Sequence, residues 1–435
     1  MTMNRTRNRL LDRVIEKGKE KFQEDYKFLL GLILISFFLH VARMFIVFST
    51  LGYGGVGWGY YSHETFSDLA PVWDGGFYLE IAQKGYARPE TVGFPPFYPF
   101  CIRFLSLIFP FKESMLLINS FCLIVATPIL AYLVSSELFQ EKTKSKLCTI
   151  VVTLNPFIVA WGTIGLSEPL GYVLCLALVY SYLKENYILN GFLYSIGILT
   201  RFAFIVAGGL FLYDLVIKRK FKDIFPLLAG GITYIGWNWY TKIAYGLTNT
   251  EVRSIYWHHY PGIKWGDISV YAQLSDFVVT ALLLLVMWTY YKKKEDKIAA
   301  LLVWGVAGYL LISIFPVYGY GQLRYVGFIL PIFLLLEGFE FEEWKSKIIM
   351  YLSASWGIVT IVVAPQLYQL YIGALDKYPY LYMADVALIL IGGVLITQYL
   401  IYNSKHYTYS KRSIIVGTAF ALAGLCLSFT VVRIF

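Results

Sequence analysis

Charged residues are scarce in this sequence, and their scarcity excludes an ordinary water-soluble fold. Only 15% of the 435 residues are charged, whereas 58% are hydrophobic. Soluble domains contain about 25% charged and roughly 45–50% apolar residues, and a chain of this length in water has no way to bury such an apolar excess. The composition therefore predicts a membrane protein, for which lipid is the solvent.

Cysteine is also rare, which argues against a disulfide framework. The five cysteines form no CxxC pair, and most lie inside apolar runs, so we interpret them as small buried hydrophobic residues. A short cleavable signal peptide is not expected either. The first apolar run, residues 26–50, follows a long charged arm and is long enough to stay in the membrane as a signal anchor.

Apolar runs recur along the whole chain and predict an all-α, multi-pass transmembrane fold of about 13 helices. Their approximate positions are 27–49, 114–136, 147–162, 168–184, 190–200, 203–217, 224–246, 272–291, 298–316, 325–339, 347–366, 381–402 and 414–433. Several are shorter than the ~20 residues of a straight span, which predicts short, broken or re-entrant helices.

The basic residues between these runs predict the topology. With the N-terminus in the cytoplasm, every basic cluster falls on the cytoplasmic side, as the positive-inside rule requires. The clusters are at 141–146, Lys184, 218–220, 292–294, 345–347 and 405–412. All of these clusters fall on the cytoplasmic side only if residues 190–217 form two short helices, with Arg201 near their apex, and not one span. It also explains the net charge of +9 without nucleic acid as a partner.

The same assignment predicts the domain organisation. Residues 1–25 form a basic cytoplasmic arm, and 26–435 form a single transmembrane domain whose outer loop, 51–113, is its main cap. Within that loop, residues 77–84 separate apolar and polar positions as an interfacial helix does. Residues 94–110 are apolar but contain four prolines, so we expect an interfacial segment and not a span.

The outer loop also carries an ordered set of motifs. They are Trp73-Asp74, Tyr78-Leu79-Glu80-Ile81-Ala82, Gly85-Tyr86 and Phe94-Pro95-Pro96-Phe97-Tyr98-Pro99. Three further pieces follow in order, namely Asn155-Pro156 with Leu166-Ser167-Glu168-Pro169-Leu170, then Leu199-Thr200-Arg201, then Arg324-Tyr325. In this combination the sequence resembles the phosphatidylinositol-glycan class V (PIG-V) mannosyltransferases and their prokaryotic relatives, with Pro96-Phe97 where Pro-Leu is usual.

The resemblance implies a GT-C glycosyltransferase architecture and an inverting transfer of mannose from dolichyl- or polyprenyl-phosphate to a glycolipid or glycan. It implies no cofactor. Such a donor already carries a good leaving group, so the enzyme needs one carboxylate to take a proton from the acceptor hydroxyl and cations or donors for the departing phosphate. We expect Asp74 to be the catalytic base.

The remaining candidates are expected to bind the donor phosphate or the substrate, and no metal site is expected. They are Arg201, Arg324, Glu168, Trp73, Tyr78, His258 and Lys264. Structural roles compete with several of these assignments: Asp74 suits a turn or helix cap and Glu168 suits the first turn of a helix. Arg201 in turn could reach the interface by snorkelling.

Other polar residues have simpler interpretations. Adjacent histidines such as His258-His259 make a poor chelate, and we interpret Asp68 as a solvated loop charge. His40 and Arg43 either line the site or act as buried polar partners.

Two other functions stay open, a transporter or lipid flippase and a non-catalytic subunit of a membrane assembly. The membrane is the plasma membrane if the source is prokaryotic and the endoplasmic reticulum if it is eukaryotic.

Overall fold

The computed structural model describes residues 25–45, 48, 65–72, 74–139, 141–154, 162–257, 301, 303 and 304. Within these residues every regular element is helical. A first helix covers Asp25–Phe45. The others are η1 (Phe66–Leu69), α2 (Asp74–Lys84), η2 (Pro89–Gly93), α3 (Phe97–Leu105), α4 (Phe111–Phe121), η3 (Cys122–Ala126), α5 (Thr127–Leu138), α6 (Lys142–Thr153), α8 (Glu168–Leu183), α9 (Tyr187–Thr200), η4 (Phe202–Ala207), α10 (Gly208–Val216), η5 (Phe221–Asp223), α11 (Ile224–Tyr245) and α12 (Asn249–Trp257).

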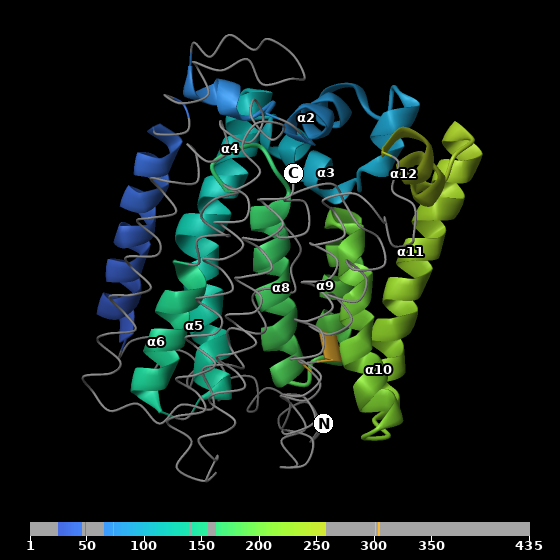
Figure 1. Ribbon diagram of the computed structural model, residues 1–435. Helices are drawn as coiled ribbons and strands as arrows, with labels where there is room; N and C mark the ends of the chain where they lie inside the picture. Colours follow the sequence, from blue (N-terminus) through green and yellow to red (C-terminus); the bar gives the residue numbers. More distant parts are fainter. Residues whose placement is uncertain are drawn as a thin grey trace, which may run out of the picture.

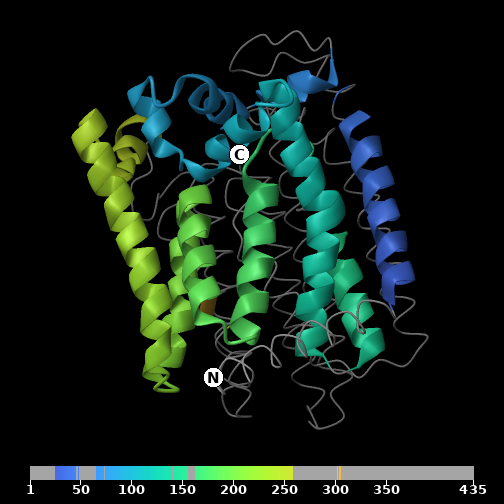
Figure 2. The same cartoon turned by 180° about the vertical axis from the view of Figure 1, so that it is seen from behind.

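These helices form two layers (Figure 1). The first helix, α4 to α6 and α8 to α11 stand side by side as a bundle, whereas α2, α3 and α12 lie across one end of it. The view from behind shows the same arrangement (Figure 2). We name the end that carries α2, α3 and α12 the cap end, and the opposite end the basic end.

Two of the described helices are long and apolar enough to cross a membrane, Asp25–Phe45 and Phe111–Leu138. The second is continuous through α4, the π-helical η3 and α5. On α11, the large apolar side chains are mostly exposed, as expected of a helix that faces lipid. The predicted total of about 13 spans is not tested, because the runs from 272 onward lie almost entirely outside the described residues.

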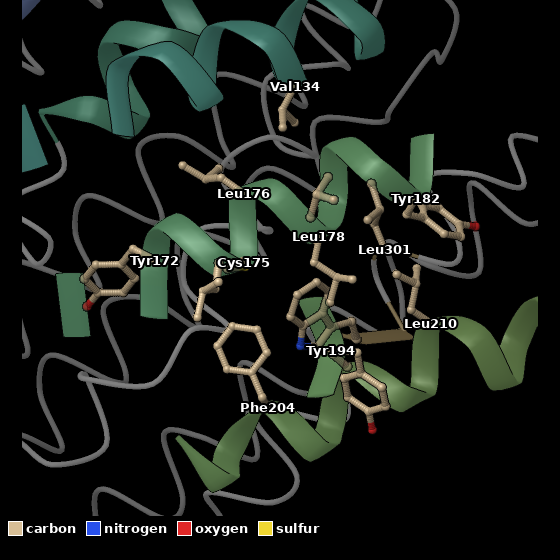
Figure 3. Close-up of a cluster of buried hydrophobic side chains, with 14 of the residues drawn as sticks. Val134, Tyr172, Cys175, Leu176, Leu178, Tyr182, Tyr194, Phe204, Leu210 and Leu301 are labelled. Atoms are coloured by element: carbon tan, nitrogen blue, oxygen red, sulfur yellow. The ribbon is translucent and has the colours of Figure 1, made fainter. Parts of the chain in front are cut away.

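The core of the bundle is centred on α8, which packs against α5 and α9 (Figure 3). Twelve of its residues are buried. Tyr172, Cys175 and Tyr182 come from α8 itself, and Phe204 and Leu210 pack against them from η4 and α10. Four cysteines are described and all are free thiols, and Cys122, Cys148 and Cys175 are buried.

The predicted break at Arg201 is confirmed. Helix α9 ends at Thr200, Arg201 is extended with φ −150° and ψ 124°, and η4 begins at Phe202. A Cβ built at Gly197 would lie 2.3 Å from the Phe204 ring, so only glycine lets the chain fold back this closely. The chain therefore turns at the cap end and returns through α10 to the basic end (Figure 1).

The helix ends and turns that carry the described basic clusters lie at the basic end (Figure 1), and several of their lysines form ion pairs. These pairs are Lys142 and Lys146 with Asp25, Lys184 with Glu137, and Lys220 with Glu185. Within the described residues, the basic clusters therefore lie at one end of the bundle, as the topology deduced from the sequence requires. The segment 94–110 contributes only the nine-residue α3 and turns, so the prediction that it does not span is confirmed.

Candidate active site

The site begins where α2 packs onto the loop that leads into α8. A Cβ built at Gly75 would lie 2.1 Å from the carbonyl oxygen of Ala70 and 2.8 Å from that of Gly165. A Cβ at Gly165 would lie 2.0 Å from the same Ala70 oxygen, and the Gly165 N–H donates to the Leu69 carbonyl at 3.3 Å. Glycine at both positions therefore permits the backbones to approach closely, which brings the start of α2 beside the start of α8.

A hydrogen-bonded chain of side chains links these two helices to the break after α9. The hydroxyls of Tyr78 and Ser167 lie 2.8 Å apart, and both side chains are buried. The Arg201 guanidinium donates from Nη1 to Ser167 Oγ at 3.2 Å. Ser167 thus joins the cap layer to Arg201, although Tyr78 and Ser167 are 89 positions apart.

Arg201 also forms a buried ion pair with Glu168. Its Nη1 lies 2.9 Å from Glu168 Oε1, and the two side chains are 12% and 1% exposed. The hydrogen bond from Arg201 Nη1 goes to Ser167 Oγ, and Glu168 Oε1 has no hydrogen-bond partner. Charge attraction therefore holds the pair. Glu168 is also the first residue of α8, where the helix dipole favours a carboxylate. The predicted helix-terminus role and the pairing with Arg201 therefore coexist.

Asp74 belongs to the same electrostatic cluster. It is the first residue of α2, and Tyr78 lies one turn further along the same helix face. The pKa of the Tyr78 phenol is raised mainly by burial; Arg201 lowers it, whereas Asp74 and Glu168 raise it. Tyr78 therefore stays a neutral hydrogen-bonding phenol between a cation and two carboxylates.

Asn119 fixes the loop that carries Ser167 and Glu168. Its Nδ2 donates to the carbonyls of Ile164 at 2.7 Å and Leu166 at 3.0 Å, and its Oδ1 accepts from the Tyr98 hydroxyl at 2.8 Å. Asn119 is fully buried. The sequence reasoning did not identify it, although a lone amide within an apolar run such as 114–136 is itself a signal.

Four of the predicted site residues therefore come together: Asp74, Tyr78, Glu168 and Arg201. The other four, Trp73, His258, Lys264 and Arg324, lie outside the described residues. Among the described residues, no group of three or more His, Cys, Asp or Glu side chains is placed to share a metal ion.

The interpretation of Asp68 as a solvated loop charge is wrong. Its carboxylate accepts from the Thr65 N–H at 2.9 Å and pairs with Lys112 Nζ at 2.7 Å, with the side chain 13% exposed. The reason is local, because Asp68 caps η1 and α4 places Lys112 beside it. His40 and Arg43 are both buried, and His40 Nε2 lies 2.9 Å from Ser120 Oγ, as in the prediction of buried polar partners.

Comparison with known proteins gives a structural likeness and no sequence match. No protein-family model matches the chain, and no curated protein matches it. ArnT from Cupriavidus metallidurans bound to undecaprenyl phosphate aligns with a TM-score of 0.50 and 16% identity, over 90% of this chain and 75% of ArnT. The apo structure of ArnT aligns with a TM-score of 0.46 and 15% identity, over 82% and 71% of the two chains. The chain is thus built on a helical fold similar to that of ArnT.

Proposed function

We propose that this chain is an integral membrane glycosyltransferase that takes its sugar from a polyprenyl phosphate. The observation that carries the proposal is the convergence of Asp74, Glu168 and Arg201, from three separate segments, at the cap end. The fold supports it, since ArnT has been observed with undecaprenyl phosphate bound. Mannose as the sugar, and membership of the PIG-V family, rest on the order of the motifs in the sequence.

The chemistry assigned to Asp74 is general-base catalysis. The carboxylate takes the proton of an acceptor hydroxyl while that oxygen attacks the anomeric carbon. A bond forms between the acceptor oxygen and the sugar, the bond from the sugar to the phosphate oxygen breaks, and the configuration inverts. One carboxylate as the base and one cation beside it are enough for this reaction, because the lipid phosphate leaves without being protonated by the enzyme.

Arg201 is assigned to the departing phosphate. Its guanidinium is 12% exposed and is held by Ser167 and Glu168. A pre-oriented arginine can bind phosphate oxygens in a fork and loses little rotamer entropy when it does so. Because Glu168 is only 1% exposed, we propose that it acts through Arg201, as a positioning residue. Arg324, Lys264 and His258 are further proposed phosphate or substrate contacts.

The orientation follows from the charge at the other end of the bundle. Lys142, Lys146, Lys184 and Lys220 lie at the basic end, which the positive-inside rule assigns to the cytoplasm. The cap end then faces the non-cytoplasmic side, where a glycolipid or glycan acceptor meets a donor whose tail remains in the bilayer.

A donor panel tests the proposal. Membranes containing the chain receive radiolabelled mannose as polyprenyl-phosphate mannose or as the nucleotide sugar, and label in lipid, glycan and protein fractions is followed. Label transferred only from the lipid phosphate, and lost with Asp74→Asn, is the expected result. Transfer from the nucleotide sugar alone would contradict the donor assignment, and movement of the lipid across the bilayer without transfer would favour a flippase.

A further inference from the structure

A second polar site lies at the basic end, far along the bundle from Asp74. A small cavity forms where the turn between α8 and α9 meets the turn between α10 and α11. The cavity volume is about 10 Å³, which is room for about one water molecule or one small ion.

Two buried side chains on this cavity have polar atoms without partners. Asn190 is 1% exposed, and neither its Oδ1 nor its Nδ2 has a hydrogen-bond partner; Asp223 is also 1% exposed, and its Oδ2 has none. Asp223 is the N-cap residue of α11, where an aspartate ordinarily accepts from the first turn, yet its side chain makes no capping bond. Capping therefore does not account for this carboxylate, and burial without a partner is costly.

The charges around the cavity leave one negative charge in excess. Lys218 Nζ lies 2.8 Å from Asp214 Oδ1, and Lys220 Nζ lies 2.9 Å from Glu185 Oε1. Each of these carboxylates has its own lysine, whereas Asp223 pairs with no lysine or arginine of the described residues. Three carboxylates face two ammonium groups, so the cluster requires one more positive charge when Asp223 is ionised.

We infer that this cavity binds one alkali-metal cation, with side-chain oxygens of Asp223 and Asn190 among its ligands. Carboxylate and amide oxygens are hard donors that suit such ions. A single excess charge matches a monovalent ion better than Ca²⁺, which recruits more carboxylates. The N-terminus of α11 contributes a partial positive charge, which makes the binding weak and exchangeable.

A proton competes for the same place. Burial and then the Asp214 carboxylate raise the pKa of Asp223 to about 6, against the lowering effect of Lys220 and Lys218. The charged and titratable groups facing Asp223 are Asp214, Lys218, Lys220, Glu185, Tyr182 and Tyr187. The proton fills the site at lower pH, and the cation fills it above that range.

Thermal unfolding of the purified full-length chain in micelles tests the inference. NaCl and KCl are each titrated against choline chloride at equal ionic strength, at about pH 8 and about pH 5. We expect a saturable rise in Tm with Na⁺ or K⁺ at the higher pH, and an apparent affinity about tenfold weaker at the lower pH because of proton competition. Asp223→Asn should abolish the response, whereas Glu137→Gln, which removes another carboxylate at the same end, should retain it.

Equal Tm values in alkali and choline salts would overturn the site, and so would an unchanged response in Asp223→Asn. Should that variant fail to fold, hydrogen exchange of the wild-type chain replaces it. Added Na⁺ or K⁺ should slow exchange in peptides covering 182–190 and 214–223 and leave α2 unchanged; no slowing in those peptides would overturn the inference.

Discussion

Removing the Arg201 and Glu168 charges singly and together separates a structural pair from a functional one. Glu168 is 1% exposed, so Arg201→Met leaves a buried carboxylate without its cation, which costs about 3–5 kcal/mol. Glu168→Gln costs less, because Arg201 is 12% exposed and its charge can reach water. The double variant leaves no buried charge and should recover most of the stability, with a coupling energy of about 2 kcal/mol or more.

The assays are denaturant unfolding of the purified variants and sugar transfer in membranes. We expect the double variant to unfold like the wild type and still to lose transfer, because the proposed contact of Arg201 with the donor phosphate is gone. If the double variant loses as much stability as the two single variants together, Arg201 and Glu168 do not stabilise each other as a buried pair. Transfer restored in the double variant would show that Arg201 only neutralises Glu168, and would remove it from the catalytic account.

Three further predictions concern packing, hydrogen bonding and pH. Gly75→Ala should lower stability by about 1–3 kcal/mol and reduce transfer, since its Cβ meets a backbone oxygen at 2.1 Å, whereas Gly231→Ala, with nothing within 4 Å, should do neither. Tyr98→Phe leaves Asn119 Oδ1 without its donor and should cost about 1–3 kcal/mol of unfolding free energy; an unchanged value would contradict the role of this hydrogen bond in holding Asn119. In alkali-free buffer, the unfolding free energy should fall as pH rises from about 4 to about 6. The reason is that the pKa of Asp223 is raised from 3.8 to about 6 in the folded protein, so that protonation favours the folded state. Asp223→Asn should remove this dependence on pH.

The helices near the site were predictable because their signals are local. Apolar runs placed α8 and α11 to within a residue or so, and Arg201 in the middle of an apolar stretch indicated a break. An arginine at membrane depth is costly unless it is paired, so the residue itself pointed to a buried partner. Which carboxylate would pair with it was not predictable, since Glu168 lies 33 positions earlier and only the fold brings the two together.

The hydrogen-bonded part of the site could not be read from the sequence. Ser167 and Asn119 are ordinary residues whose importance comes from distant partners, Tyr78 across 89 positions and Ile164 across 45. The same lack of long-range information made Asp68 look solvated, although Lys112 neutralises it across 44 positions. Residue type and the family resemblance singled out Asp74, Glu168 and Arg201 as candidates, but they did not identify the hydrogen-bonded network around them.

The most direct test of the central claim compares Asp74→Asn with Glu80→Gln at equal protein level. Both changes remove one negative charge from α2, but Glu80 pairs with Arg88 at the surface, whereas Asp74 belongs to the cluster around Tyr78. We predict that Asp74→Asn lowers the transfer rate from polyprenyl-phosphate mannose by about 10²–10⁴-fold, and that Glu80→Gln leaves it near the wild-type value. Equal rates in the two variants would contradict the assignment of Asp74 as the catalytic base.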